Sequence, residues 1–406
     1  MNRKQLLILL VIGLVAGGLG FYLYRSGEAS YKTSDQTPGK KLLGDFPIND
    51  VAQVVIKQGT NELNLVKEDD LWKVRERFNY PANFSEISEF VRKAANLKTV
   101  QSPQVGASQF ARLELTKPGQ GTNSGTLVEF KDKSGKAIKS LLLGKKYLRE
   151  SPESSPMGGG GYPVGRYMMV MDGAQKVALV SDALANVEPK PDNWLNKDFF
   201  KIEKLRAISI ASPIDTNNWK LTRETETGDW SLADKKEGEE LDKGKSSSVS
   251  YALSSPSFND LASPEAKPEE TGMDKPVVAS LETFDNFVYT VKIGKKTGED
   301  NFYMAMAVTA DLPKERPPGK DEKPEDKEKL EKEFKDKVEK LKEKLDKEKA
   351  FEKWTYLVSK WTVDPLLKER KDLFADKKAE TKKDEAAEKK AEPDAPEKDD
   401  FKEDPK

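Results

Sequence analysis

Residues 46–72 read FPINDVAQVVIKQGTNELNLVKEDDLW, and they begin a pattern that recurs through most of the chain. The apolar run VVI is followed by a turn at Gly59, after which Leu63 and Leu65 alternate with polar residues. Alternation with a period of two is typical of a strand with one buried face, and glycine favours a tight turn. The stretch therefore predicts a β-hairpin that leads to Trp72.

A second copy of this pattern has its apolar run at 208–210 and its tryptophans at Trp219 and Trp230. Later stretches match in the same order: GKK at 294–296 with 144–146, FYMAM at 302–306 with RYMMVM at 166–171, YLVS at 356–359 with ALVS at 178–181, and KDLF at 371–374 with KDFF at 197–200. Self-similarity in a fixed order indicates an internal duplication. We therefore expect two tandem repeats, at 46–199 and 200–374.

The first repeat is predicted to contain one helix that covers a sheet. Asn83 followed by Glu86 resembles a capping box, because a side-chain oxygen at the helix start accepts from a free amide. Apolar residues then recur at helical spacing, at Phe84, Ile87, Phe90, Val91, Ala94 and Leu97. This spacing predicts an amphipathic helix whose apolar face lies on the sheet.

Further strands of the first repeat are expected at 112–116, 126–131 and 137–144, with a turn at 133–135 between the last two. Asp172-Gly173 between two apolar runs predicts a tight hairpin. Strands, one helix and more strands indicate a mainly antiparallel domain of the α+β class. We expect the same sheet-plus-helix architecture in both repeats.

The second repeat departs from the first at two places. Pro256 follows the helix expected after Lys245 and should shorten it. A charged insertion at Thr309–Ala350 replaces the tight hairpin turn, and its apolar residues form a narrow helical seam at Leu330, Phe334, Val338, Leu341 and Leu345. The insertion is either a solvated helix supported by its own ion pairs or a coiled-coil-like arm that docks on a partner or on its own domain. From residue 375 to 406 the composition predicts a disordered charged tail.

The N-terminal residues predict a membrane anchor. Leu6 to Tyr24 contains no charged residue, and its 19 residues would span roughly 30 Å as a helix, the thickness of a bilayer core. Basic residues precede the span, so the N-terminus should remain in the cytoplasm and the bulk of the chain should be periplasmic. We expect a transmembrane helix at 1–25 and a linker at 26–45. A cleaved signal peptide is the alternative.

Composition excludes several kinds of chemistry. The 406 residues include no cysteine and no histidine, so thiolate nucleophiles, zinc–thiolate sites and Ser-His-Asp triads are impossible. Lys plus Arg number 69 against 70 Asp plus Glu, a balance that does not favour nucleic acid as a partner. Chemistry based on carboxylates, lysine or a Ser-Lys pair remains open.

Three patterns in the sequence are candidate functional sites. The glycine-rich stretch from Ser154 to Arg166 lacks the Lys-Ser/Thr of a phosphate loop, so it is interpreted as a surface loop, with a binding lid as the alternative. Six tryptophans are interpreted mainly as core, with sugar stacking as the alternative: Trp72, Trp194, Trp219, Trp230, Trp354 and Trp361. Acidic pairs at 69–70 and 239–240 are interpreted as solvated turn residues. The sequence predicts no catalytic, cofactor-binding or metal-binding residue.

Several of these stretches together resemble one bacterial family. They are the N-terminal apolar span, the strand–glycine–strand–tryptophan opening, YPAN at 80–83, the GKK strand ends and WLNKDFF at 194–200. Over about Met1 to Phe374 the chain is similar to the membrane-anchored domain of unknown function 4340 family. The resemblance implies an accessory role in the cell envelope, since members tend to be encoded beside ABC transporter components of the gliding-motility type.

We therefore expect a non-enzymatic, single-pass protein of the bacterial inner membrane, without a cofactor. It would serve as an accessory or assembly subunit of an ABC-type export or gliding-motility-like complex. Its expected partners are the inner membrane, through Leu6 to Tyr24, and envelope proteins such as ABC transporter subunits. A periplasmic glycan- or peptide-binding module is the first alternative, and a carboxylate-dependent hydrolase is the second.

Overall fold

The computed structural model describes residues 38–375, apart from 122, 150–161, 174–175, 299, 318–322 and 324–325. Within these residues, no helix combines the length and the apolar character that crossing a bilayer requires. The predicted anchor at Leu6 to Tyr24 and the predicted tail beyond residue 375 lie outside the described residues. The described residues form two compact units: the first contains those up to 200 together with 257–267 and 353–358, and the second contains the other described residues.

The first unit is built on an antiparallel sheet of nine strands in the order β4-β3-β2-β1-β6-β7-β8-β9-β5. The strands are β1 (Gln53–Gln58), β2 (Asn61–Glu68), β3 (Leu71–Val74), β4 (Tyr80–Pro81), β5 (Thr99–Gln101), β6 (Thr126–Lys131), β7 (Ala137–Arg149), β8 (Tyr162–Val170) and β9 (Val177–Val180). The predicted opening hairpin is confirmed, because Val54 pairs with Leu65 and Ile56 pairs with Leu63. These four side chains are fully buried, so their alternation marks the core face.

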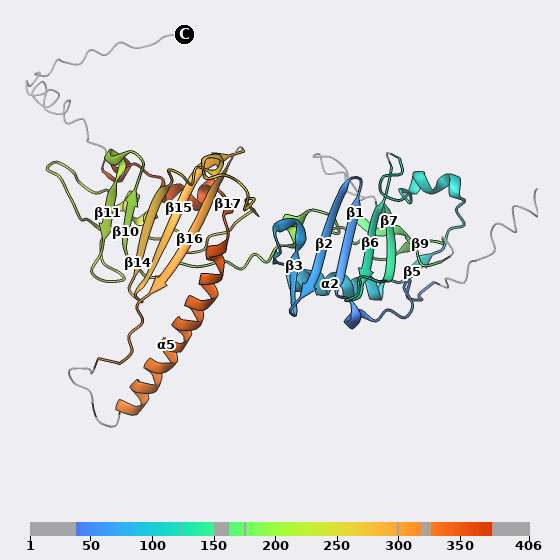
Figure 1. Ribbon diagram of the computed structural model, residues 1–406, viewed down its shortest axis with the longest axis horizontal. Helices are drawn as coiled ribbons and strands as arrows, with labels where there is room; N and C mark the ends of the chain where they lie inside the picture. Colours follow the sequence, from blue (N-terminus) through green and yellow to red (C-terminus); the bar gives the residue numbers. More distant parts are fainter. Residues whose placement is uncertain are drawn as a thin grey trace, which may run out of the picture. The chain divides into compact units, whose positions relative to one another are not determined.

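The helix α2 (Phe84–Asn96) packs on this sheet as the apolar spacing predicts, and Figure 1 shows it running across the strands. Its start is fixed by Asn83, whose side-chain oxygen accepts from the backbone amide of Glu86 at 3.3 Å. Its buried face consists of Ile87, Phe90, Val91 and Ala94. The Phe90 ring lies 5.5 Å from the ring of Phe130 on β6. Helix and sheet therefore share one aromatic core.

Residues 38–45, predicted as the end of a linker, pack against the first unit instead. Leu42 and Leu43 are buried, and the amide of Leu42 donates to the carbonyl of Leu97 at 2.8 Å. The polar composition upstream concealed these two leucines, which are apolar enough to join the core. The first unit therefore begins before residue 46.

The first unit also takes in chain that lies far away in the sequence. The Tyr80 ring lies 5.7 Å from Phe258, 5.3 Å from Trp354 and 6.4 Å from Tyr356. The Phe199 ring lies 4.6 Å from Tyr356. Edge-to-face and tilted geometries of this kind add about 0.5–1.5 kcal/mol per pair to the free energy gained by burial. This aromatic cluster attaches residues 257–267 and 353–358 to the first unit.

An ion pair reinforces the same attachment. The guanidinium of Arg77 donates to both carboxylate oxygens of Asp260, with 2.7 Å between Nη2 and Oδ2. Lys197 donates to the carbonyl of Asn259 at 2.7 Å. A two-pronged arginine–carboxylate contact fixes orientation as well as distance. These contacts therefore fix the position of the segment around Asp260 relative to Arg77 and Lys197.

The second sheet has eight strands in the order β12-β11-β10-β14-β15-β16-β17-β13. They are β10 (Leu205–Ala211), β11 (Trp219–Thr222), β12 (Ser231–Leu232), β13 (Asp260–Leu261), β14 (Val277–Thr283), β15 (Phe287–Thr297), β16 (Asn301–Ala310) and β17 (Tyr356–Ser359). With β4 set aside, its order matches that of the first sheet strand by strand. The α+β class and the two antiparallel sheets agree with the prediction.

The helices of the second half are short, with one exception. They are α3 (Lys243–Val249), α4 (Pro268–Thr271), α5 (Lys327–Lys349) and α6 (Lys360–Val363). The predicted shortening is confirmed, because α3 has 7 residues where α2 has 13. The helix begins at Lys243, slightly earlier than predicted, since Asp242 accepts from the amide of Lys245 at 2.8 Å.

The exception, α5, lies in the charged insertion and is attached to the second unit by its C-terminal half. Glu348 is only 4% exposed, and it accepts hydrogen bonds from the Tyr289 hydroxyl at 2.7 Å and from the amide of Lys201 at 3.1 Å. Lys337 pairs with Asp285 at 2.8 Å. All five seam residues are half-buried. Docking on its own domain is thus confirmed, while the N-terminal end of α5 projects beyond the strands in Figure 1.

Two local predictions are wrong. Residues 112–116 do not form a strand, since a 3-10 helix (Ala107–Leu113) ends within that stretch and Glu114 then adopts a left-handed φ of 56°. Asp172-Gly173 is not a two-residue turn, because the last pair between β8 and β9 joins Met169 to Val177. The hairpin itself is present, with a longer loop in which the Asp172 carboxylate accepts from the amide of Ser140 at 3.1 Å.

We predict that Tyr289→Phe weakens the attachment of α5. The variant removes the hydroxyl that donates to buried Glu348, so we expect the free energy of unfolding to fall by about 1–3 kcal/mol. Urea denaturation of the full chain measures this loss. Tyr303→Phe is the matched control, since no described residue hydrogen-bonds the hydroxyl of half-buried Tyr303 on β16. Equal losses in the two variants would contradict the prediction.

A second prediction concerns Arg370, which is 7% exposed and clamps the C-terminal segment of the second unit. It donates to Glu239 at 2.8 Å and to the Asp234 carboxylate at 2.9 Å, and this contact lowers the pKa of Glu239 to about 2. A carboxylate with a lowered pKa stabilises the fold above its unfolded pKa of about 4.5, and this contribution is lost as the pH falls toward 2.

We therefore expect Arg370→Ala to lower the melting temperature at pH 7 and to flatten its decrease between about pH 4.5 and 2. Circular dichroism melts across that range provide the measurement. Lys371→Ala should leave the wild-type profile unchanged, since the Lys371–Glu369 pair is exposed. Parallel profiles for wild type and Arg370→Ala would refute the clamp.

Candidate functional site

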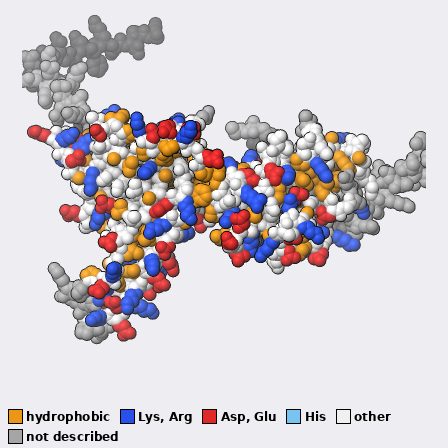
Figure 2. Space-filling model, viewed as in Figure 1, with side chains coloured by type: hydrophobic (Ala, Val, Ile, Leu, Met, Phe, Trp, Pro, Cys, Tyr) orange, Lys and Arg blue, Asp and Glu red, His pale blue; other side chains and the backbone are white. Residues whose placement is uncertain are grey.

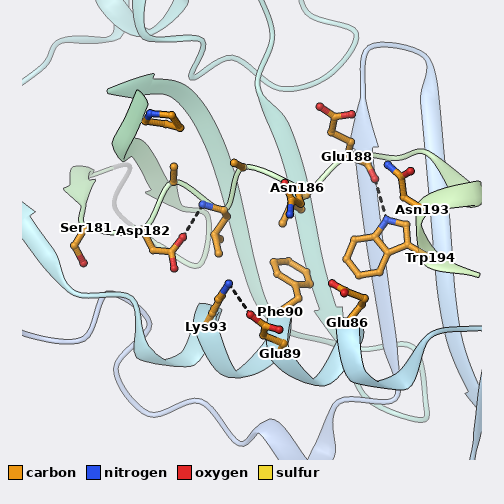
Figure 3. A pocket seen from close by; sticks show the side chains of 15 residues that line it. Glu86, Glu89, Phe90, Lys93, Ser181, Asp182, Asn186, Glu188, Asn193 and Trp194 are labelled. Atoms are coloured by element: carbon orange, nitrogen blue, oxygen red, sulfur yellow. Dashed lines mark hydrogen bonds and ion pairs between the residues drawn. The ribbon is translucent and has the colours of Figure 1, made fainter. Parts of the chain in front are cut away.

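A groove lies in the first unit, between α2 and the segment that follows β9 (Figure 3). Its cavity volume is about 790 Å³, within the range of roughly 300–1,000 Å³ that small-ligand sites occupy. The helix contributes Glu86, Glu89, Phe90 and Lys93, and the opposite wall runs from Ser181 to Trp194. Figure 3 shows the charged side chains of α2 directed toward this wall.

The helical wall follows from the amphipathic pattern of α2. Its core face is buried, so the residues at the edge of that face point along the sheet rather than into it. Glu86, Glu89 and Lys93 are three or four positions apart and are exposed. Side chains at this spacing line up on one side of a helix. The wall is therefore a charged strip beside an apolar floor.

The opposite wall is held by its own hydrogen bonds. The Asp182 carboxylate accepts from the amide of Leu184 at 2.9 Å, and the carbonyl of Leu184 accepts from the amide of Val187 at 3.2 Å. The tight turn requires a positive φ of 43° at Leu184. Residues other than glycine rarely adopt such an angle. The indole N–H of Trp194 donates to the carbonyl of Glu188 at 3.1 Å. The segment is thus a fixed turn.

Two carboxylates of the groove, those of Glu89 and Glu188, form ion pairs with lysines. Lys93 pairs with Glu89 at 2.7 Å and lowers the pKa of that carboxyl. Lys190 pairs with Glu188 at 2.7 Å with the same effect on its pKa. A general acid near neutral pH needs a raised carboxyl pKa, so these two groups have the opposite character. The groove can bind, but these residues are not prepared for proton transfer.

Three of the six tryptophans are core, so the interpretation from the sequence holds for half of them. Trp72, Trp194 and Trp219 are at most 8% exposed, and Trp230 and Trp354 are half-buried. Trp361 is the exception at 63% exposed. A sugar-stacking platform requires an exposed ring face, which the three buried tryptophans lack.

The glycine-rich stretch and the acidic pairs, the other candidates from the sequence, lie in different parts of the structure. Most of the glycine-rich stretch lies outside the described residues, but Tyr162 to Arg166 belongs to β8 rather than to a loop. Asp69 and Asp70 occupy a turn as expected. Glu239 is not simply solvated, because Arg370 donates to it. Within the described ranges, no group of three or more acidic residues is arranged to hold a metal ion.

Sequence reasoning missed the groove and a buried arginine close to it. The groove joins α2 to a segment about ninety residues later, so no local pattern reveals it. Arg166, at 6% exposed, did leave a signal. It is a charged residue inside the apolar strand RYMMVM, and a long side chain of this type is rarely buried without a reason.

We predict that Trp194 is a structural anchor of the groove. Trp194→Ala removes a buried ring and the hydrogen bond to the Glu188 carbonyl. The free energy of unfolding should therefore fall by about 3–5 kcal/mol. Trp361→Ala, at an exposed position, should change stability by no more than about 0.5 kcal/mol. Thermal and urea unfolding of the full chain compare the two. Similar effects would show that Trp194 does not hold the wall.

Comparison with known proteins gives one match. Among curated proteins and solved structures, nothing matches this chain. The model of the domain of unknown function family DUF4340 matches residues 72–276, just over half of the 406 residues. This range covers α2, the groove and the start of the second unit. The chain therefore belongs to the DUF4340 family.

Proposed function

We propose that this protein is a non-enzymatic subunit of the bacterial cell envelope, held at the inner membrane by residues 1–25 with its bulk in the periplasm. The observation that carries the proposal is the uncharged stretch from Leu6 to Tyr24 ahead of two folded units. Such a stretch is long enough to span a bilayer. In this proposal the two folded units would present their binding surfaces to the periplasm.

The chemistry of the described residues supports binding rather than catalysis. Histidine and cysteine are absent, and the pKa values of Glu89 and Glu188 are lowered by neighbouring lysines. Catalytic groups usually have pKa values moved toward the working pH. These carboxylates remain fully ionised and paired, so a hydrolase that relies on them is disfavoured.

The surface supports protein partners over nucleic acid. On the face seen in Figure 2, positive and negative side chains are interspersed over both units. Nucleic-acid binding needs a clustered basic face. The projecting end of α5, rich in Glu and Lys, offers a long charged surface of the kind that fixes partner choice. We propose ABC-type export or gliding-motility-like components as partners, following the resemblance of the sequence.

A glycan- or peptide-binding module is the second candidate, and the groove of the first unit favours it. The cavity is open and of ligand size, and its walls offer carboxylates and an amide, Asn186, to hydroxyl or amine groups. The buried state of Trp194 argues for hydrogen bonding rather than stacking as its mode of recognition. In this second candidate function too, the chain would be anchored in the inner membrane with its bulk in the periplasm.

The proposal predicts three linked results. Protease added to intact spheroplasts should digest the bulk of the chain. The tagged full-length protein in mild detergent should co-purify with ABC transporter subunits, identified by mass spectrometry. A variant lacking residues 1–25 should lose membrane retention.

Protection of the chain in spheroplasts, or purification without any transporter subunit, would contradict the proposal. Saturable binding of glycan fragments or peptides by that uncomplexed protein would instead support the binding-module candidate. Tagged inner-membrane protein of unrelated function, prepared in the same detergent, is the control for adventitious co-purification.

A further inference from the structure

A second cavity of the first unit has a different charge character from the groove. Its volume is about 320 Å³, and it shares Ala185, Val187 and Glu188 with the groove, so the turn after β9 forms a wall of both. The charged residues that line it are Glu114, Lys145, Lys146, Arg166 and Glu188. Cations therefore outnumber acids here, the reverse of the groove.

Arg166 is the central residue of this cavity. It lies on β8 and is 6% exposed. Its Nε donates to the carbonyl of Gly144 at 2.7 Å, and its Nη1 donates to the carbonyls of Ala183 and Leu184, each at 3.4 Å. All three acceptors are neutral. The contacts hold the guanidinium in place without neutralising its charge.

The charge of Arg166 is incompletely compensated. Among the described residues, none forms an ion pair with it, and none accepts a hydrogen bond from Nη2. Burial lowers the pKa of Arg166, while Glu114 and Glu188 act in the opposite direction from beyond ion-pair distance. Arginine nevertheless stays protonated in proteins. A buried cation without a partner is costly, so an anion placed beside it is strongly stabilising.

The remaining charges favour an incoming anion. Lys146 donates to the carbonyl of Ala185 at 3.3 Å, another neutral acceptor, and Lys145 is exposed at the rim. Of the two acids, Glu188 is engaged by Lys190 at 2.7 Å. Glu114 is left as the acid that opposes a bound anion. The three positive charges of the cavity outweigh this single negative charge.

We propose that this cavity binds an oxyanion, a carboxylate or a phosphate group, held by Arg166 and by Lys145 and Lys146. A guanidinium with a spare Nη2 is suited to oxyanions, because its planar fork matches their geometry. The volume suits a small group rather than a whole ligand, and is near the lower limit for such sites. The inference is independent of the membrane anchor and of any transporter partner.

Thermal unfolding of the full chain in detergent tests the site with two probes, sodium phosphate and sodium acetate, at constant ionic strength in sodium chloride. A ligand that binds only the folded state raises the melting temperature in proportion to ln(1 + [L]/Kd). We expect a rise that follows this logarithm. A rise with phosphate alone assigns a phosphoryl group, and a rise with acetate alone assigns a carboxylate such as a peptide C-terminus.

Four variants locate the binding. Arg166→Met and the double variant Lys145→Ala/Lys146→Ala should each lower the affinity for the anion by about tenfold. Glu114→Gln removes the opposing charge and should tighten binding about threefold. Lys139→Ala is the matched control, because Lys139 is a lysine of the same strand that pairs with Asp172 outside the cavity. It should leave the affinity unchanged.

The outcomes separate binding from a purely structural role for Arg166. If Arg166→Met does not fold, the lysine double variant and Glu114→Gln still decide the question. The proposal is overturned if neither probe gives a rise that follows ln(1 + [L]/Kd), or if the rise is equal in the lysine double variant, in Glu114→Gln and in the control.

Discussion

The packing of Phe90 between Phe130 and Trp194 is the contact on which the described surface of the first unit depends. The Phe90 ring lies 5.5 Å from Phe130 and 5.9 Å from Trp194, and Phe130 in turn lies 5.0 Å from Phe46. This row of rings joins the start of the unit, the sheet, α2 and the segment after β9. Each pair adds about 0.5–1.5 kcal/mol beyond burial. Because both walls of the groove attach to this row, the groove is as rigid as the core beneath it.

Much of the architecture follows from local pattern. The hairpin at β1 and β2, the capped α2 and the two-sheet α+β class were all predictable, because each depends on periodicity or on a cap within a few residues. The matching strand orders of the two sheets support the interpretation as a duplication. The strand predicted at 112–116 was wrong, since a 3-10 helix ends at Leu113 and Glu114 then adopts a left-handed φ of 56°, which interrupts an extended run.

The sites were harder to predict, for a physical reason. Glu348 is one of many glutamates in α5, and its contacts with the distant Tyr289 and Lys201 distinguish it. Leu42 and Leu43 were hidden by polar neighbours. Arg166 carried the clearest signal, a charge within an apolar strand, but its acceptors come from Gly144 and from the turn at 183–184. Contacts between segments far apart in the sequence leave no periodic trace, whereas a residue that violates a strand's pattern does.

The aromatic cluster around Tyr80 has a consequence for biogenesis. The first unit includes Phe258 and Tyr356, so a nascent chain that has emerged only to residue 200 lacks those rings. Synthesis must therefore reach residue 358 before this half of the protein can close. The intervening polypeptide, including all of α5, is made before Phe258 and Tyr356 cover Tyr80 and Phe199, so these two rings stay exposed on the nascent chain until then.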